Sequence, residues 1–236
     1  MSDTSRHRAG DSAELSGALS EGPLVTEGPG LLVMDVDSTL IEQEVIELIA
    51  ERAGTRELVA EVTARAMRGE LDFAASLRER VATLAGVRES VFADVLAEVR
   101  PTQGAAELIE ALHARGCRVG VVSGGFEEVV VPLTKRLGIE HVAANRLEVA
   151  GSCLTGRVLW RIVDRQEKVH CLRTWARQDG VPMERTIAVG DGANDLGMLE
   201  AAGLGVAFCA KPVVVEQADA AIHVRDLRAV LQLIGG

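Results

Sequence analysis

Two short acidic segments carry the residues of this sequence that are best suited to chemistry. Asp35 and Asp37 follow a run of four apolar residues, and Asp191 and Asp195 belong to the segment GDGAND, which follows a second apolar run. Each segment alone has an ordinary explanation, because Asp and Ser are common in turns and Asp195 could cap a helix. Asp35, however, lies in an expected buried strand, where a charge needs a metal or a partner. Because Mg²⁺ binds carboxylate oxygens and water, we interpret the two segments as halves of one divalent-metal site.

A serine beside two glycines and a distant lysine complete the candidate functional residues. Ser123 and Gly124 end another apolar run, in the segment VVSGGF. A hydroxyl and backbone N–H groups at such a place can cradle an anion. Lys168 lies at the start of a predicted helix. Taken singly, the glycines are typical of a turn and the lysine is typical of a solvated surface.

In their order along the chain, these segments resemble the haloacid dehalogenase superfamily of phosphotransferases. The motif DxDST comes first, then the serine, the lysine and GDGxND, and the resemblance extends from Leu31 to the C-terminus. It implies that Asp35 attacks phosphorus and forms an aspartyl-phosphate. Asp37 would protonate the leaving oxygen and later deprotonate water. It also implies a Mg²⁺ ion held by Asp35, Asp191 and the backbone carbonyl of Asp37. Asp195 would support the metal or its waters.

The same resemblance implies a set of groups that bind the substrate's phosphate. Lys168, Ser123 and backbone donors near Gly124 would stabilise the phosphoryl oxygens. Asn194 would contact the phosphate or the rest of the substrate. Several further segments are similar to the phosphoserine phosphatase family, namely GELDFAASLRERV at residues 69–81, VVSGGF, ANRL, VGDGANDLGM, AFCAKP and RDLR.

An arginine in the first of these segments has an unusual position. Arg80 lies in the middle of an apolar stripe, since Phe73 and Leu77 precede it at helical spacing. Its ordinary explanation is an arginine that reaches water along that face. By the resemblance, its guanidinium binds a substrate carboxylate, Glu44 meets a substrate ammonium group, and Met67 and Phe73 shield the substrate. By periodicity alone, Glu44 would be a solvated helix residue and the other two would be core residues.

The elements that must position these residues alternate between strands and helices. This pattern predicts an α/β fold with a Rossmann-like, doubly wound parallel sheet, as in the haloacid dehalogenase core. Residues 147–161 predict a β-hairpin. We expect residues 31–40 and 101–236 to form the catalytic core and residues 41–100 to form a helical cap inserted after the first strand. Residues 1–30 show no sustained periodicity and predict a disordered N-terminal tail.

The composition narrows the classes of partner. The 236-residue chain has 25 Lys and Arg against 35 Asp and Glu, a net charge of −10, and 3% aromatic residues. Because the acidic surplus repels phosphate backbones and few aromatic rings are available for stacking, we expect no nucleic-acid partner. No apolar run approaches the roughly 18 residues of a membrane-spanning helix, so we expect no membrane partner. Four scattered cysteines predict free thiols in a reducing cytoplasm.

Together these features predict an enzyme that acts on a small phosphorylated amino acid. The resemblance implies Mg²⁺-dependent hydrolysis of O-phosphoserine to serine and phosphate, the last step of serine biosynthesis, by a monomer or homodimer. The nearest alternative is transfer of the same phosphoryl group to another alcohol, such as homoserine, or action on another small phosphomonoester. A non-enzymatic receiver module also uses clustered Asp, Ser or Thr, and Lys with Mg²⁺. The large insertion after the first strand argues against the receiver.

Overall fold

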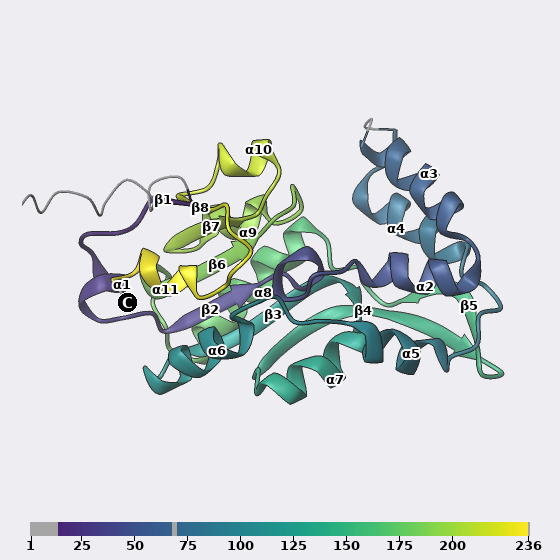
Figure 1. Cartoon of the computed structure of the whole chain (residues 1–236), viewed down its shortest axis with the longest axis horizontal. Helices are drawn as coiled ribbons and strands as arrows, with labels where there is room; N and C mark the ends of the chain where they lie inside the picture. The colour runs from purple at the N-terminus through teal and green to yellow at the C-terminus, as the bar shows by residue number, and fades with distance from the viewer. Residues whose placement is uncertain (1–13, 68–69, 236) are drawn as a thin grey trace, which may run out of the picture.

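An eight-stranded sheet runs through the described part of this computed structural model, residues 14–67 and 70–235 (Figure 1). The strand order is β1-β8-β7-β6-β2-β3-β4-β5, parallel from β8 to β4 with an antiparallel strand at each edge. From the central β2 the chain moves outward to β4, then returns to β6 and continues to β8 on the other side, which confirms the doubly wound α/β fold. The strands are β1 (Leu15–Ser16), β2 (Leu31–Met34), β3 (Arg118–Phe126), β4 (His141–Ala150), β5 (Cys153–Leu159), β6 (Thr186–Gly190), β7 (Leu204–Phe208) and β8 (Ala220–Ile222).

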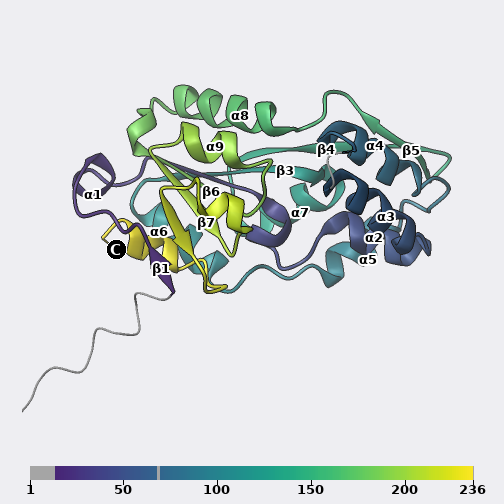
Figure 2. The same ribbon diagram turned by 90° about the horizontal axis from the view of Figure 1, so that it is seen from above.

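Both faces of the central strand are buried, as its apolar sequence requires. In β2, Leu32 and Met34 pack into one hydrophobic cluster, whereas Leu31 and Val33 pack into another. The first cluster includes α6 (Ala105–Ala114), α7 (Glu127–Leu137) and α11 (Ala229–Leu233), and the second includes α8 (Arg165–Gln178) and α9 (Leu196–Ala201) (Figure 2). Since helices cover both faces, polar residues that leave the strands gather at the carboxyl edge of the sheet.

Four helices occupy the segment between β2 and α6. They are α2 (Val45–Ala53), α3 (Arg56–Met67), α4 (Phe73–Ala82) and α5 (Val91–Glu98), and they lie at the end of the molecule toward which β4 and β5 extend (Figure 1). Ile41 pairs with Pro101 in an isolated bridge, so the chain enters and leaves this helical segment at one point. The sequence predicts that the first helix carries Ile41, but α2 begins only at Val45 because a distorted turn, Val36–Leu40, follows β2.

The hairpin predicted at residues 147–161 is confirmed, and its first strand begins earlier than expected. The sequence predicts a separate short strand near residues 141–144, but the structure continues this strand to Ala150 as β4, which pairs with β5. Gly151 and Ser152 form the tip of the hairpin with φ of 58° and 59°, the left-handed pair that suits a two-residue connection. The long hairpin carries the sheet under the helical segment, where β5 packs against α4.

Residues 14–30 contradict the prediction of a disordered tail. β1 extends the sheet by pairing antiparallel with β8, and α1 (Pro23–Thr26) buries the side chain of Leu24. Elements of two and four residues are too short to produce a periodic pattern, so the sequence gives no signal for them. Residues 1–13, the rest of the predicted tail, lie outside the described residues.

The remaining helical elements are short. A 3₁₀ turn (Met183–Arg185) precedes β6, and α10 (Pro212–Val215) follows β7. Among the helices described here, none is both long enough and apolar enough to cross a membrane.

Candidate active site

Asp35 follows the last residue of the central strand and is only 6% exposed. Its Oδ1 accepts a hydrogen bond from the backbone N–H of Val36 at 2.8 Å and lies 2.8 Å from Nζ of Lys168. Burial raises the pKa of the Asp35 carboxyl well above its ordinary value, and the Lys168 ammonium opposes that rise. Two donors at one oxygen hold this side chain in a single orientation.

Asp37 lies in the distorted turn that separates β2 from α2. Its Oδ1 accepts a hydrogen bond from the backbone N–H of Val45, the first residue of α2, at 2.9 Å. Its Oδ2 lies beside Gly125, where an added Cβ would come within 2.7 Å. Burial, followed by the negative charge of Glu44, raises the pKa of Asp37 to about 7. At neutral pH this carboxyl therefore exchanges protons readily.

Lys168 joins the two acidic segments, and its side chain is fully buried instead of solvated. Its Nζ lies 2.8 Å from Oδ1 of Asp35 and 2.6 Å from Oδ1 of Asp195. Burial lowers the pKa of Lys168, but these two carboxylates raise it further, and the net pKa lies above the ordinary value. Asp195 precedes α9 without capping it, because its Oδ2 accepts the backbone N–H groups of Asp191 and Gly192 at 3.1 and 3.0 Å.

The two acidic segments meet at the carboxyl edge of the sheet. Asp35, Asp191 and Asp195 offer carboxylate oxygens that all lie within 4.8 Å of one another. Burial, followed by the charge of Asp195, raises the pKa of Asp191 to about 6. Thr39, from the turn after β2, donates its hydroxyl to Oδ1 of Asp191 at 3.4 Å. All these donor atoms are oxygens, so the cluster suits a hard divalent cation such as Mg²⁺.

Ser123 and Gly124 lie near the end of β3 and have different surroundings. Ser123 is fully buried, and its Oγ accepts the backbone N–H of Gly125 at 2.8 Å. Gly124 lines the site cavity, and its carbonyl accepts a hydrogen bond from Asn145 at 2.8 Å. Asn145 also accepts the N–H of Val163 at 2.8 Å. Ser123 and Asn145 therefore fix the backbone conformation of Gly124 and Gly125, called here the glycine loop, near the end of β3.

The helical segment supplies the opposite wall of the site. Glu44 stands immediately before α2 and accepts a hydrogen bond from the hydroxyl of Ser38 at 2.7 Å. Phe73 begins α4, and Arg80, two turns later on the same helix, lines the cavity with it. Burial lowers the pKa of Arg80 and the charge of Glu44 raises it. Met67 ends α3, and its side chain lies outside what the structure describes.

One cavity of about 310 Å³ collects most of the predicted residues. The cavity lining does not include Ser123, Lys168 or Asp195. Their hydrogen bonds instead hold in place groups that line the cavity. The residues that line the cavity include seven predicted from the sequence together with Gly124, namely Asp35, Asp37, Glu44, Phe73, Arg80, Asp191 and Asn194.

Several residues of the site are not among those predicted from the sequence. Glu47, Thr63 and Lys211 line the cavity, and Arg225 donates to the carbonyl of Ser38 at 3.0 Å, which anchors the turn that holds Asp37. Lys211 belongs to the AFCAKP segment, so its presence near the strand β7 terminus could have suggested a role. Arg225 belongs to the RDLR segment, which is likewise similar to the family, whereas Glu47 and Thr63 stand in ordinary helical surroundings.

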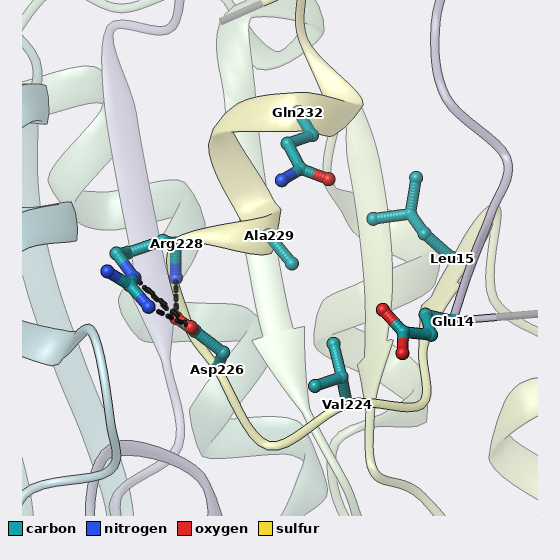
Figure 3. A pocket seen from close by; sticks show the side chains of 7 residues that line it. All are labelled: Glu14, Leu15, Val224, Asp226, Arg228, Ala229 and Gln232. Atoms are coloured by element: carbon teal, nitrogen blue, oxygen red, sulfur yellow. Dashed lines mark hydrogen bonds and ion pairs between the residues drawn. The ribbon is translucent and has the colours of Figure 1, made fainter. Parts of the chain in front are cut away.

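A second cavity of about 400 Å³ lies between β1, the segment after β8 and α11 (Figure 3). Its charged lining residues include Asp226 and Arg228, which pair with each other, and Glu14. None of the residues predicted to act in the reaction lines it. The smaller cavity with the acidic cluster is therefore the candidate active site.

Comparison with known proteins agrees with this assignment. A family model described as haloacid dehalogenase-like hydrolase matches residues 32–200. A phosphoserine phosphatase of Streptococcus thermophilus is 52% identical over 210 residues, which are 89% of this chain and 98% of that protein. A solved structure of a phospho-aspartyl intermediate analogue of phosphoserine phosphatase has a TM-score of 0.83 and 43% identity, and the match covers 87% of this chain and 99% of that one.

A substrate-bound phosphoserine phosphatase structure is equally similar, with a TM-score of 0.83, 42% identity, and coverage of 87% of this chain and 98% of that one. The family match covers both acidic segments, the glycine loop and Lys168. The chain belongs to the phosphoserine phosphatase family of haloacid dehalogenase-like hydrolases.

Proposed function

We propose that this chain is a phosphoric monoester hydrolase that converts O-phosphoserine to serine and phosphate through a phosphorylated Asp35. The observation that carries this proposal is one cavity that is lined by two carboxylates, Asp35 and Asp37, and by a cation and an acid from the helical segment, Arg80 and Glu44. Phosphoserine carries a phosphate, a carboxylate and an ammonium group. Arg80 is complementary to the carboxylate and Glu44 to the ammonium group, while Asp35 and Asp37 are placed to react with the phosphate, and the high identity to phosphoserine phosphatases supports this match.

Asp35 would be the nucleophile. Among the described residues, its hydrogen-bond donors reach Oδ1, so Oδ2 is the oxygen available for attack. Attack on phosphorus forms an Oδ2–P bond, breaks the bond from phosphorus to the serine oxygen, and leaves an aspartyl-phosphate. Lys168 holds the attacking carboxylate in place and balances part of its charge.

Asp37 would be the general acid and base. With a pKa of about 7, a substantial fraction of the carboxyl is protonated at neutral pH and can donate its proton to the departing serine oxygen. The carboxylate that remains then takes a proton from the water that attacks the phosphorylated Asp35. This second attack releases phosphate and regenerates both carboxyl groups.

The acidic cluster would hold a Mg²⁺ ion through Asp35, Asp191 and the backbone carbonyl of Asp37. Such a cation, when bound, lowers the repulsion between an anionic carboxylate and an anionic phosphate. Both oxygens of Asp195 already accept hydrogen bonds, from Lys168 and from the backbone of the loop that carries Asp191. We therefore assign Asp195 the role of supporting the metal-binding loop.

Recognition of the amino-acid part would come from the helical segment, which we propose acts as a cap over residues 31–40 and 101–236. Arg80 would bind the carboxylate and Glu44 the ammonium group, while Phe73 and Met67 would shield the substrate from water. On the core side, Asn194 and the backbone near Gly124 would contact the phosphate. Ser123 would act through the glycine loop that its hydroxyl positions.

This activity would serve serine biosynthesis. All four cysteines are free, which fits a reducing compartment, so we propose the cytoplasm.

The experiment that tests the proposal measures phosphate release from a panel of phosphomonoesters with Mg²⁺ and with EDTA. The panel contains phosphoserine, phosphoethanolamine, which lacks the carboxylate, and p-nitrophenyl phosphate. We expect the highest kcat/KM with phosphoserine and loss of turnover in EDTA. A preference for a substrate without the carboxylate would contradict the proposal.

A second arm identifies the acceptor. Adding homoserine to the phosphoserine reaction should leave the yield of inorganic phosphate unchanged. Accumulation of phosphohomoserine in place of phosphate would instead identify a phosphotransferase.

A further inference from the structure

Lys211 brings to the cavity an ammonium group that none of the roles above uses. It lies in the loop between β7 and α10, and its backbone N–H donates to the carbonyl of Asp191 at 3.3 Å. Its side chain is exposed and lines the cavity. Within residues 14–67 and 70–235, no carboxylate lies within ion-pair distance of it. Burial raises the pKa of Glu44 and of Asp191 and the Lys211 charge lowers it, but the ammonium group forms no ion pair with either carboxylate.

Lysine is rare in this chain. Of its 25 basic Lys and Arg residues, only Lys135, Lys168 and Lys211 are lysines. Lys168 contacts two carboxylates, those of Asp35 and Asp195, and Lys135 is an exposed residue in the last turn of α7. Lys211 is thus the one lysine in the described chain that lines the cavity.

The cavity lining is mostly acidic, so a positively charged ammonium group in it affects the binding of an anionic substrate. Five acidic residues line the cavity, namely Asp35, Asp37, Glu44, Glu47 and Asp191, whereas its basic lining residues are Arg80 and Lys211. A substrate that bears a doubly charged phosphate meets an excess of negative charge there, even after a divalent cation is bound. Each unpaired cation in the lining therefore has a large effect on affinity.

The position of Lys211 indicates which substrate group it meets. Arg80 and Glu44 come from the helical segment, whereas Lys211 belongs to the core and is tied through its backbone to Asp191. Asp191 lies beside Asp35 in the acidic cluster. The phosphorus atom that Asp35 attacks must lie on this side of the cavity, so Lys211 can reach the phosphoryl end of the substrate.

We infer that Lys211 is a further substrate-binding residue whose ammonium group binds the phosphoryl group of the substrate. This inference rests on the proposed function for the identity of the substrate, but it concerns any phosphomonoester that enters the cavity. It distinguishes Lys211 from Arg80, because a phosphate-binding cation acts on every phosphomonoester, whereas a carboxylate-binding cation acts on phosphoserine alone.

The kinetic test compares Lys211→Gln and Lys211→Arg, with Lys135→Gln as the matched surface control. For Lys211→Gln we expect kcat/KM to fall by about tenfold, the size of one charge-assisted hydrogen bond, mainly through KM. The fall should be similar for phosphoserine and p-nitrophenyl phosphate. Lys211→Arg should recover most of the loss, and Lys135→Gln should match the wild type. An unchanged kcat/KM, or a loss confined to phosphoserine, would overturn the inference.

A second test does not depend on turnover. Limited acetylation with acetic anhydride, followed by mass spectrometry, reports on Lys135 and Lys211 in separate peptides. Inorganic phosphate with Mg²⁺ should slow acetylation of Lys211 and leave that of Lys135 unchanged. Equal rates with and without phosphate would contradict the inference. If the wild type does not hydrolyse phosphoserine, the proposed function fails, and this protection experiment still decides the role of Lys211.

Discussion

The ammonium nitrogen of Lys168 lies 2.8 Å from Oδ1 of Asp35, and both side chains are almost completely buried. The same nitrogen lies 2.6 Å from Asp195, so one cation faces two buried anions. The partly buried Asp191 adds a third carboxylate to the cluster, so negative charge exceeds positive charge there. A buried excess of this kind needs a further cation, which supports the proposed metal site from the protein's own charges.

Removal of the Lys168 ammonium should destabilise the fold as well as stop catalysis. In Lys168→Met, Asp35 and Asp195 lose their common partner and remain buried, for which we expect a loss of about 3–5 kcal/mol in the free energy of unfolding. Urea denaturation in EDTA measures this loss without compensation from a bound metal. Lys135→Met is the control and should retain wild-type stability. A Lys168→Met protein as stable as the wild type would show that the buried ion pairs contribute little.

Substitutions of Asp35 and of Asp37 should block different steps of the reaction. p-Nitrophenyl phosphate has a leaving group that needs no proton. With this substrate the Asp37→Asn enzyme should still become phosphorylated on Asp35, but its aspartyl-phosphate should be hydrolysed slowly. We expect a burst of about one equivalent of p-nitrophenolate, followed by steady turnover reduced by about 10²–10⁴-fold. Asp35→Asn should give neither burst nor phosphoenzyme. Rapid-quench kinetics measures both, and labelling of Asp35→Asn at another residue would refute the assigned nucleophile.

Arg80 should determine which phosphomonoester the enzyme prefers. Arg80→Ala removes the proposed carboxylate partner, so kcat/KM for phosphoserine should fall by about 10–100-fold, whereas that for p-nitrophenyl phosphate should change little. Arg78→Ala, on the exposed side of the same helix, is the matched control and should leave both values unchanged. Equal losses for the two substrates would exclude a role for Arg80 in recognising the carboxylate.

The polar residues of the core could be predicted from the sequence because each follows a strand in a parallel sheet. Asp35 directly follows β2, Asp191 directly follows β6, and Ser123 lies near the end of β3. The carboxyl ends of such parallel strands meet at one edge of the sheet. The apolar runs identified the strands, and the topology then brought the side chains together. Arg80 could be predicted for a different reason, since a charge within an apolar helical stripe is conspicuous.

Other features depend on tertiary contacts that no local pattern encodes. The local sequence is typical of a solvated Lys168, but the side chain is buried because it pairs with two carboxylates from distant segments. Ser123 faces Gly125 instead of the cavity, a difference that depends on the course of one loop. β1 exists only because β8 offers a free edge to it. Lys211 belongs to the AFCAKP segment, but only the fold, which joins its backbone to Asp191, brings it to the site.

The core and the helical segment should be coupled through Gly124 and Phe73. A Cβ added at Gly124 would lie 2.9 Å from Cζ of Phe73, too close for a normal contact. Gly124→Ala should therefore displace the ring and raise KM for phosphoserine. Phe73→Leu removes the outer part of the ring, so Gly124→Ala should have a smaller effect in that background, with a coupling of about 1 kcal/mol or more in kcat/KM. Phe92→Leu, on α5 away from the cavity, should leave the effect of Gly124→Ala unchanged. Strict additivity of Gly124→Ala and Phe73→Leu would mean that the glycine is required for the course of the loop itself and not for the space it leaves to the ring.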